Sequence, residues 1–254
     1  MSAREEFLKQ FRAEPNPYSN IKKIFAIVSG KGGVGKSLVT ALSAITMQKK
    51  GYKCAILDAD VTGPSIPNIF HLQKPLYGTE EGILPKETAS GIKVISANFM
   101  VEDPSQAIIW RSPMITSVIK QFYSEVYWGD IDYMFIDLPP GTGDVPLTVF
   151  QSLPVDGIII VTTPQDLVSM IVEKSIDMAE KMEIPIVGVV ENMSYIKCPD
   201  CGKKISLFHN NDVLVKKYSK IAEIPLDPEL SSACDRGTLE AYQNDYLDPL
   251  ADLI

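Results

Sequence analysis

The sequence has 254 residues, which is enough to form one large α/β domain with a full hydrophobic core. Its formal net charge is −8, and it contains no basic run interleaved with aromatic residues, so we expect no surface for nucleic acid or anionic membranes. It has no stretch of about eighteen or more apolar residues, and its first residues lack the apolar centre of a secretory signal, so we expect a cytoplasmic protein.

Strand-like apolar runs alternate with helix-length amphipathic segments, which is typical of a mostly parallel sheet covered by helices on both faces. We predict strands at residues 24–29, 54–57, 94–97, 133–136, 157–161, 185–190 and 221–224. We predict helices at residues 37–50, 113–127, 167–182 and 212–218. The segment 61–83 is rich in Pro, Gly and Asn, and we predict an active-site loop there with a short helix near residues 66–71.

The predicted domain organisation is one domain with short appendages. Residues 1–20 are charged and end in a proline-containing segment, so we predict a helix followed by a loose tether. Residues 21–254 are predicted to form a single α/β domain, with a cysteine-containing loop at about residues 192–210.

A glycine-rich loop follows the first predicted strand. It reads Gly30-Lys31-Gly32-Gly33-Val34-Gly35-Lys36-Ser37 and leads directly into the first predicted helix, the context of a phosphate-binding loop. The glycines let consecutive backbone N–H groups point at phosphate oxygens, at the positive end of a helix. Lys36 would neutralise the β- and γ-phosphates, and the hydroxyl of Ser37 would join a Mg²⁺ shell. The loop therefore predicts ATP binding.

Acidic side chains stand at the ends of two predicted strands. Asp58 and Asp60 follow the second strand, and Asp137 follows the fourth. Both positions lie at the carboxyl edge of the sheet, where ligands bind in open α/β folds. We predict that Asp137 holds Mg²⁺, that Asp58 supports the metal shell and that Asp60 orients the attacking water. Asp144 is a candidate sensor of nucleotide state at a dimer interface.

The four cysteines are too few for a disulfide scaffold in a chain of this size. Cys54 lies in an apolar run and is predicted to be a buried strand residue, and Cys234 is predicted to be structural. Cys198 and Cys201 form a C-x-x-C turn before a glycine, a spacing that lets both sulfurs face one metal. Zinc or a [4Fe–4S] cluster normally takes four ligands, which two chains related by two-fold symmetry would supply. The pair therefore predicts a metal at a dimer axis.

The early lysine of the glycine-rich loop, Lys31, is not required for phosphate binding alone. The spelling G-K-G-G-V-G-K-S resembles the deviant Walker A motif of the MinD/ParA/nitrogenase-iron-protein class of P-loop ATPases. In that class the early lysine reaches across a dimer interface to the partner's nucleotide. The resemblance therefore implies a homodimer in which Lys31 acts on the nucleotide of the other chain.

Further motifs are similar to those of the Mrp/ApbC family of ATPases, which carry or assemble iron–sulfur clusters. They are D-A-D-V-T-G-P-S-I-P at residues 58–67, I-W-R-S-P-M at 109–114, D-L-P-P-G-T-G-D at 137–144 and E-N-M-S-Y-I-K-C-P-D-C-G at 191–202. The resemblance extends from about residue 21 to the C-terminus. It implies an ATPase that uses ATP and Mg²⁺, whose two cysteines per subunit bridge a [4Fe–4S] cluster at the dimer interface for transfer to apoproteins. We expect its intrinsic turnover to be slow.

The resemblance also indicates which residues contact the nucleotide. From the phosphate loop these are Gly30, Gly32, Gly33, Val34, Gly35, Lys36, Ser37 and Leu38, the last standing where the family commonly has threonine. Asn192 matches a position that contacts adenine in related ATPases, and Pro225 and Asp227 match the other wall of the base pocket. His209, which follows the cysteine pair, is a conceivable extra metal ligand, although a surface histidine is the simpler interpretation.

Three other functions are compatible with parts of this pattern. A positioning ATPase of the MinD/ParA type would need a basic face or an amphipathic C-terminal helix, whereas the tail at residues 244–254 is acidic and interrupted by proline. A P-loop scaffold with structural zinc at the cysteine pair stays open, because thiolate pairs also accept zinc. A redox disulfide is the third, but the pair does not stand at the head of a helix after the first strand.

Overall fold

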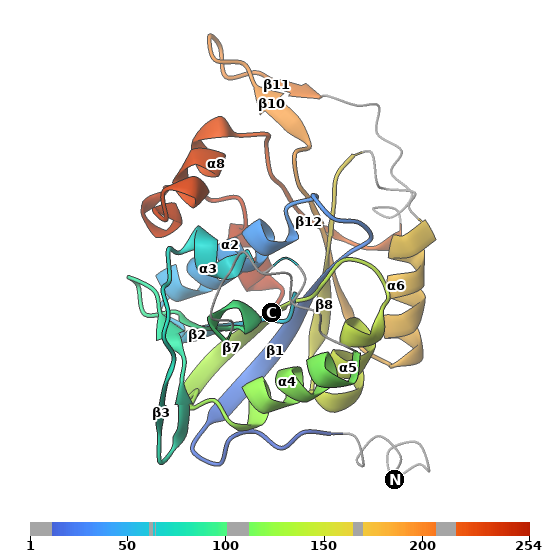
Figure 1. Ribbon diagram of the computed structural model, residues 1–254. Coiled ribbons are helices and arrows are strands. Elements are labelled where there is room, and N and C mark those ends of the chain that lie inside the picture. The colour runs from blue at the N-terminus through green and yellow to red at the C-terminus, as the bar shows by residue number, and fades with distance from the viewer. Residues whose placement is uncertain (1–11, 61–62, 64, 101–111, 165–169, 207–216) are drawn as a thin grey trace.

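An eight-stranded sheet runs through the part of the protein that the structure describes (Figure 1). The structure is a computed structural model, and it describes residues 12–60, 63, 65–100, 112–164, 170–206 and 217–254. The strand order is β12 (Lys220–Glu223), β9 (Ile186–Glu191), β8 (Gly157–Thr162), β1 (Asn20–Ser29), β7 (Asp130–Asp137), β2 (Cys54–Asp58), β6 (Lys93–Ser96) and β5 (Lys86–Glu87).

Neighbouring strands of this sheet are parallel, apart from the antiparallel pair β5–β6. The carboxyl ends of the parallel strands therefore meet at one edge. Two short hairpins lie outside the sheet: β3 (Tyr77–Thr79) pairs with β4 (Gly82–Leu84), and β10 (Tyr195–Lys197) pairs with β11 (Lys204–Ser206). Figure 1 shows the β10–β11 hairpin projecting away from the body of the sheet.

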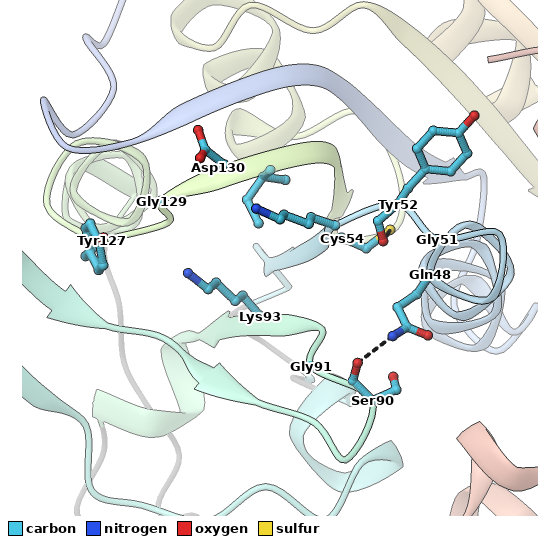
Figure 2. A pocket seen from close by; sticks show the side chains of 12 residues that line it. Gln48, Gly51, Tyr52, Cys54, Ser90, Gly91, Lys93, Tyr127, Gly129 and Asp130 are labelled. Carbon is cyan, nitrogen blue, oxygen red and sulfur yellow. Dashed lines mark hydrogen bonds between the residues drawn. The ribbon is translucent and has the colours of Figure 1, made fainter.

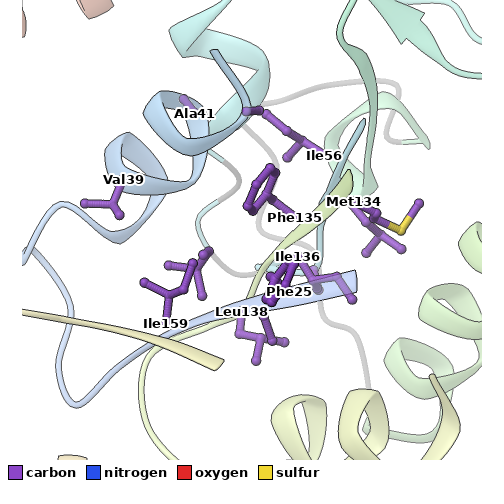
Figure 3. Close-up of a cluster of buried hydrophobic side chains, with 14 of the residues drawn as sticks. Phe25, Val39, Ala41, Ile56, Met134, Phe135, Ile136, Leu138 and Ile159 are labelled. Carbon is purple, nitrogen blue, oxygen red and sulfur yellow. The ribbon is translucent and has the colours of Figure 1, made fainter. Parts of the chain in front are cut away.

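Helices cover the sheet on both faces. The helix α2 (Lys36–Lys49) packs against the central strands on one face, and α4 (Ser112–Ser124) and α5 (Asp144–Ser152) lie on the other (Figures 1 and 3). The remaining α-helices of the described residues are α3 (Ile66–Ile69), α6 (Met170–Lys181) and α8 (Pro228–Asp235). Short 3₁₀ turns follow at η1 (Ala97–Met100), η2 (Leu239–Ala241) and η3 (Asp248–Asp252). None of the helices in the described ranges has the length and apolarity that a membrane span requires.

The central strands are buried on both faces, so their sequences are nearly continuous apolar runs instead of alternating ones. Every residue of β2 and of β8 is buried. Figure 3 shows side chains from the sheet, among them Phe135 and Ile159, packed with Val39 and Ala41 of α2. Fully burying an aliphatic or aromatic side chain of this kind stabilises the fold by about 1.5–3 kcal/mol. This core holds the carboxyl ends of β1, β2 and β7 in place.

The predicted fold class, a mostly parallel sheet with helices on both faces, is confirmed. The predicted strands lie within or close to the observed ones, but β1 and β7 begin earlier than predicted because they pair along their length, from Asn20 opposite Asp130 to Ile27 opposite Asp137. The sequence interpretation missed the helices α5 and α8 and the five short hairpin or edge strands β3, β4, β5, β10 and β11. Most of the helix predicted at residues 212–218 lies outside the described residues.

The segment from Arg12 to the start of β1 is not the loose tether that we predicted. The backbone N–H of Ala13 donates to the carbonyl of Ser152 at 2.8 Å. The side chain of Asn16 is buried, and its Nδ2 donates to the carbonyl of Glu81 at 2.8 Å. These contacts fix the segment to the domain, because buried polar groups that lose their partners are costly. The helix predicted before it falls on residues 1–11, outside the described residues.

Candidate functional site

The glycine-rich loop joins the carboxyl end of β1 to the first turn of α2. Gly33 and Gly35 have φ angles of +81° and +83°, the left-handed conformation that glycine adopts without steric cost. Gly35 is the N-cap residue of α2, which begins at Lys36. The loop backbone therefore lies at the positive end of a helix, an arrangement suited to binding phosphate oxygens.

A cavity of about 370 Å³ opens beside this loop. Its lining includes the loop residues Lys31, Gly32, Gly33, Gly35, Lys36, Ser37 and Leu38, together with Ser29, Asp60, Gly63, Ser65, Ile69, Pro140 and Cys234. Among the described residues, apart from Gly33 and its two chain neighbours, no atom lies within 4 Å of the position that a Cβ would take on Gly33. The open space beside backbone and ammonium donors fits the phosphates of a nucleotide.

Asp137, the last residue of β7, is the centre of a buried polar cluster. Its Oδ1 pairs with Lys36 Nζ at 2.7 Å and accepts a hydrogen bond from Thr40 Oγ1 at 2.9 Å, and its Oδ2 accepts one from Ser37 Oγ at 2.6 Å. Lys36 Nζ also lies 3.7 Å from Asp60 Oδ2. Carboxylate and hydroxyl oxygens are the donors that Mg²⁺ prefers, so this set fits a nucleotide-bound magnesium ion.

Asp58 lies at the end of the adjacent strand, β2, opposite Asp137 in the parallel register. Its Oδ2 accepts a hydrogen bond from Ser96 Oγ at 2.9 Å, and its Oδ1 accepts one from the backbone N–H of Asp60 at 3.2 Å. Burial, reinforced by the negative charge of Asp137, raises the pKa of Asp58 well above its ordinary value. A divalent cation beside these carboxylates would relieve that cost.

The structure thus brings together the predicted residues Lys36, Ser37, Asp58, Asp60 and Asp137. Two other residues of the cluster were missed by the sequence interpretation. Thr40 lies one helical turn after Lys36, so the (i, i+4) spacing was a signal that could have placed it on the same face. Ser96 ends β6, the strand beside β2, and only knowledge of the strand order could have placed it at Asp58.

Lys31 and Asp144 lie at exposed positions near this edge of the sheet. Lys31 is exposed and lines the cavity beside the phosphate loop. Asp144 is exposed at the first position of α5, where a negative charge is favoured by the helix dipole. These placements are compatible with roles at an interface.

The three residues predicted to form an adenine pocket do not line the cavity beside the phosphate loop. Asn192 is buried, and its Nδ2 donates to the backbone carbonyl of Val34 at 2.8 Å. Asp227 caps α8: its Oδ1 accepts from the backbone N–H groups of Glu229 and Leu230, at 2.9 and 3.3 Å. In this conformation both side chains make structural contacts.

Pro225 and Asp227 line a separate cavity of about 460 Å³, between the β10–β11 hairpin and α8. Asp227 Oδ2 accepts hydrogen bonds from the hydroxyls of Tyr242 and Tyr246. Burial opposes ionisation of this carboxyl, but these hydrogen bonds and those from the backbone lower its pKa below the ordinary value. One wall of the cavity is therefore acidic, and its carboxylate already accepts hydrogen bonds from two tyrosine hydroxyls and two backbone N–H groups.

Cys198 and Cys201 lie in the tight turn that closes the β10–β11 hairpin. The backbone N–H of Cys198 donates to the carbonyl of Lys203 at 2.9 Å, and that of Gly202 donates to the carbonyl of Cys198 at 2.9 Å. Gly202 has a φ angle of +70°, which the return of the chain requires. Cys198 is half-buried and Cys201 is exposed. The hairpin thus presents two thiols at its tip.

The turn favours the thiolate form of Cys198. Hydrogen bonds from the backbone N–H of Cys201, then from that of Asp200 and from the Cys201 thiol, lower its pKa. The thiolate is the form that binds metals. Among the described residues, no group of three or more His, Cys, Asp or Glu side chains is placed to hold a metal ion. His209, the conceivable extra ligand, lies outside the described residues.

The other two cysteines have different surroundings. Cys54 is buried in β2, as predicted, and burial raises the pKa of its thiol to about 12. Cys234 is half-buried in α8 and lines the cavity beside the phosphate loop. Burial also raises the pKa of Cys234. Both thiols are therefore held in the neutral form that binds metal poorly.

A larger cavity, of about 540 Å³, lies at the opposite edge of the sheet (Figure 2). Cys54, Lys93 and Asp130 line it, and each stands at the amino end of its strand. Lys93 Nζ donates to the carbonyl of Trp128 at 2.7 Å, and burial lowers its pKa. Ligands of parallel α/β sheets bind at the carboxyl edge. The smaller cavity beside the phosphate loop is therefore the better candidate for the nucleotide.

A phosphate loop, a carboxylate at the end of the strand beside it and a parallel sheet define a P-loop NTPase. The family model of NUBPL iron-transfer P-loop NTPases, within the ParA group, matches residues 20–251. The chain therefore belongs to the NUBPL iron-transfer P-loop NTPase family, and the resemblance drawn from its motifs is confirmed at that level.

Relatives and solved structures agree with this assignment. The chain is 43% identical over 255 residues to an iron–sulfur cluster carrier protein of Clostridium perfringens, covering 93% of this chain and 87% of that protein. It is 40% identical over 250 residues to the cytosolic Fe–S cluster assembly factor CFD1 of Kluyveromyces lactis, covering 94% and 87%.

A nucleotide-binding protein from Archaeoglobus fulgidus, solved in complex with ADP, superposes with a TM-score of 0.79 at 44% identity, covering 89% of this chain and 90% of that one. MinD of Pyrococcus furiosus shares the fold, with a TM-score of 0.62 at 20% identity and coverage of 91% and 97%.

Proposed function

We propose that this protein is an ATP-dependent carrier of iron–sulfur clusters, which holds a [4Fe–4S] cluster between two copies of the chain and transfers it to apoproteins. The observation that carries this proposal is the hairpin tip, where one tight turn holds two thiols, the half-buried Cys198 and the exposed Cys201. Two thiols leave a cluster half-ligated, and a second copy supplies the missing pair. The relatives named as cluster carriers and assembly factors support the same cargo.

The phosphate loop and the buried cluster would bind ATP and Mg²⁺. The loop N–H groups and the Lys36 ammonium hold the β- and γ-phosphates, once Lys36 leaves Asp137. Ser37 and Asp137 then supply oxygen ligands for the metal, directly or through water, and Asp58 supports that shell. Bound magnesium supplies charge neutralisation at the phosphates. The structure of a protein 44% identical to this chain, solved in complex with ADP, supports nucleotide binding by this chain.

Hydrolysis is assigned to Asp60, which follows β2 and lines the cavity beside the phosphate loop. Its Oδ1 accepts a hydrogen bond from the backbone N–H of Gly63 at 3.2 Å, and its Oδ2 lies 3.7 Å from Lys36 Nζ. A carboxylate fixed in this way can orient a water molecule for attack on the γ-phosphate. We expect turnover by the isolated protein to be slow, as in other switch ATPases that lack a stimulating partner.

Lys31 is assigned to the nucleotide of the second chain in the homodimer. Its exposed position at the mouth of the cavity leaves it accessible to a facing copy. Lys31→Ala should therefore retain ATP binding but lose most turnover. Mixing this variant with an excess of Lys36→Ala chains tests the assignment, because in the mixed dimer one site regains both lysines. Normal hydrolysis by Lys31→Ala alone would overturn it.

The test of the cargo is anaerobic reconstitution with iron and sulfide. We expect a broad absorption band in the violet-blue, lost in Cys198→Ala and in Cys201→Ala, and retained in the control Cys234→Ala. The loaded protein should then convert an apo-ferredoxin to its cluster-bound form, with the recovery of ferredoxin absorption as the readout. Retention of zinc at one ion per dimer, in the presence of excess iron and sulfide, would instead support a structural zinc site.

The setting of this activity follows from the same relatives. The Kluyveromyces lactis protein is named a cytosolic assembly factor. We place the present chain in the cytoplasm as well, where thiols stay reduced and remain available as cluster ligands. Its recipients would be apo iron–sulfur proteins of that compartment. Fractionation of cells that express the chain with a small C-terminal tag tests this placement.

A further inference from the structure

The turn between β9 and β10 touches the phosphate loop at one end and carries the cysteine hairpin at the other. Residues 192–194 form this turn. The side chain of Asn192 is 1% exposed, and its Nδ2 donates to the carbonyl of Val34, within the phosphate loop, at 2.8 Å. Its backbone N–H donates to the carbonyl of Thr162, at the end of β8, at 2.8 Å. Asn192 is therefore fixed to both the sheet and the loop.

The turn and the phosphate loop are closely packed against each other. Gly35 has a φ angle of +83°, and a Cβ built on it would collide with Asn192 Nδ2 and come within 4.0 Å of Met193 Cε. Met193 itself has a φ angle of +53°, a conformation that a non-glycine residue holds only when its surroundings impose it. Both side chains of the turn thus rest against the backbone of one glycine.

The other end of the turn leads directly into the metal-binding hairpin. The backbone N–H of Ser194 donates to the carbonyl of Ile224 at 3.0 Å, and that of Leu226 donates to the carbonyl of Tyr195 at 2.8 Å. Tyr195 begins β10, which ends at Lys197, immediately before Cys198. A displacement of the turn is therefore passed to the cysteine pair through a short, hydrogen-bonded segment.

We propose that Asn192 is a positioning residue that couples the phosphate loop to the cysteine hairpin, so that nucleotide binding changes the conformation of the hairpin. This inference rests on the proposed function and specifies how the two sites of that function communicate. When phosphate occupies the loop, Lys36 must leave Asp137, and we infer that the backbone at Val34 and Gly35, which leads into Lys36, shifts with it. Asn192 follows that backbone because its amide is bonded to Val34 and packed on Gly35.

The experiment measures amide hydrogen exchange of the iron-free chain by mass spectrometry, with and without saturating Mg²⁺ and a non-hydrolysable ATP analogue. We expect the nucleotide to change the exchange rates of peptides covering residues 195–206 about fivefold or more. Asn192→Ala, tested at an analogue concentration that calorimetry shows to be saturating for this variant, should show no change in the hairpin. Asn244→Ala is the matched control, because this residue lies in the C-terminal segment, and its hairpin should respond as in the wild type.

A second variant keeps the proposal testable if Asn192→Ala does not fold. Inserting two glycines between Met193 and Ser194 leaves the phosphate loop, Asn192 and both cysteines in place but breaks the rigid link. This insertion should retain nucleotide binding and lose the hairpin response. A hairpin response retained in either variant would overturn the proposal, as would its absence in the wild-type chain. Because no iron is present, failure here is distinguishable from failure to load a cluster.

Discussion

The phosphate loop and the cysteine hairpin differ in how complete they are within one chain. At the phosphate loop, Asp137, at the buried end of β7, already holds a lysine and two hydroxyls of α2 at 2.6–2.9 Å. The hairpin consists of two strands of three residues and presents its thiols at an exposed tip. The first site is preorganised by the core, whereas the second, under the proposed function, is completed by a second copy of the chain.

This difference predicts that substitutions at the phosphate loop change turnover and stability together, whereas substitutions at the hairpin change metal binding alone. The reason lies in burial. A buried charged group that loses its partner destabilises the fold, but an exposed thiol at the tip of a short hairpin stabilises little.

The largest effect is expected from Lys36→Ala, which should reduce ATP turnover by about 10²-fold or more and weaken nucleotide binding. Asp60→Asn should lower turnover by a similar factor while leaving binding nearly unchanged, because its carboxylate is assigned to the attacking water. Phosphate release and nucleotide calorimetry separate the two. Lys203→Ala, in the hairpin, is the control and should hydrolyse ATP normally. Wild-type turnover by Asp60→Asn would disprove its role.

Two glycines of the phosphate loop, Gly33 and Gly35, allow a matched comparison of how alanine changes the free energy of unfolding. Both have φ near +80°, so alanine at either position adopts an unfavourable backbone, at a cost of about 1–2 kcal/mol. Only at Gly35 would the added Cβ also collide with Asn192, which should cost about 1–3 kcal/mol more. Urea unfolding of Gly33→Ala and Gly35→Ala measures the difference. Equal losses would show that the contact with Asn192 is loose.

The buried carboxylate of Asp58 predicts an unusual dependence of stability on pH. Because its pKa in the folded protein is raised above the ordinary 3.8, the folded state binds the proton more tightly than the unfolded state does. The free energy of unfolding therefore falls as pH rises above 3.8 toward the raised pKa. Asp58→Asn should be more stable than the wild type at neutral pH without metal, and the two should converge in acid.

Asp132→Asn is the control for Asp58→Asn, because we expect it to change the free energy of unfolding at neutral pH in the opposite direction. A hydrogen bond from Lys22 lowers the pKa of Asp132, so its charged form stabilises the fold above pH 3.8 and this contribution disappears in acid. The variant should therefore be less stable than the wild type at neutral pH, by a small amount because the pair is near the surface. If Asp58→Asn instead loses stability at neutral pH, its carboxylate is charged and stabilised by its neighbours.

The smallest effects on stability are expected at the hairpin. Cys198→Ala and Cys201→Ala should change the free energy of unfolding of the iron-free chain by less than about 0.5 kcal/mol, although both abolish iron binding. Cys54→Ala should do the reverse: it should retain iron but lose about 1 kcal/mol or more, because it leaves a cavity in the core. Thermal unfolding measures the stability of the three variants, and an iron assay after reconstitution measures how much iron each one binds.

The sequence predicted the fold and the phosphate loop well because both depend on local pattern. Buried parallel strands leave continuous apolar runs, and the loop glycines are required at fixed spacings. Helix α8 left a local signal too, an N-cap aspartate at Asp227 followed by Pro228. Asp227 has this structural role in the helix, and its place in a base pocket stays a prediction.

Other features could not be predicted from local pattern. The contact of Ser96 with Asp58 depends on β6 lying beside β2, and the bond from Asn192 to Val34 joins residues 158 positions apart. Strands of two or three residues, such as β3 and β5, are too short for their periodicity to be recognised. Helix α5 follows a glycine-containing segment, begins at the exposed Asp144 and contains Pro146, so the start of its sequence resembles a loop.

Native mass spectrometry of the anaerobically reconstituted protein tests most directly whether the hairpin site is shared between chains. We expect a species of two chains carrying one [4Fe–4S] cluster, which dissociates into monomers without iron when the cluster is removed by a chelator. Cys198→Ala chains should give no such species. A cluster bound by a single chain, or two chains joined by one zinc ion after reconstitution, would contradict the account.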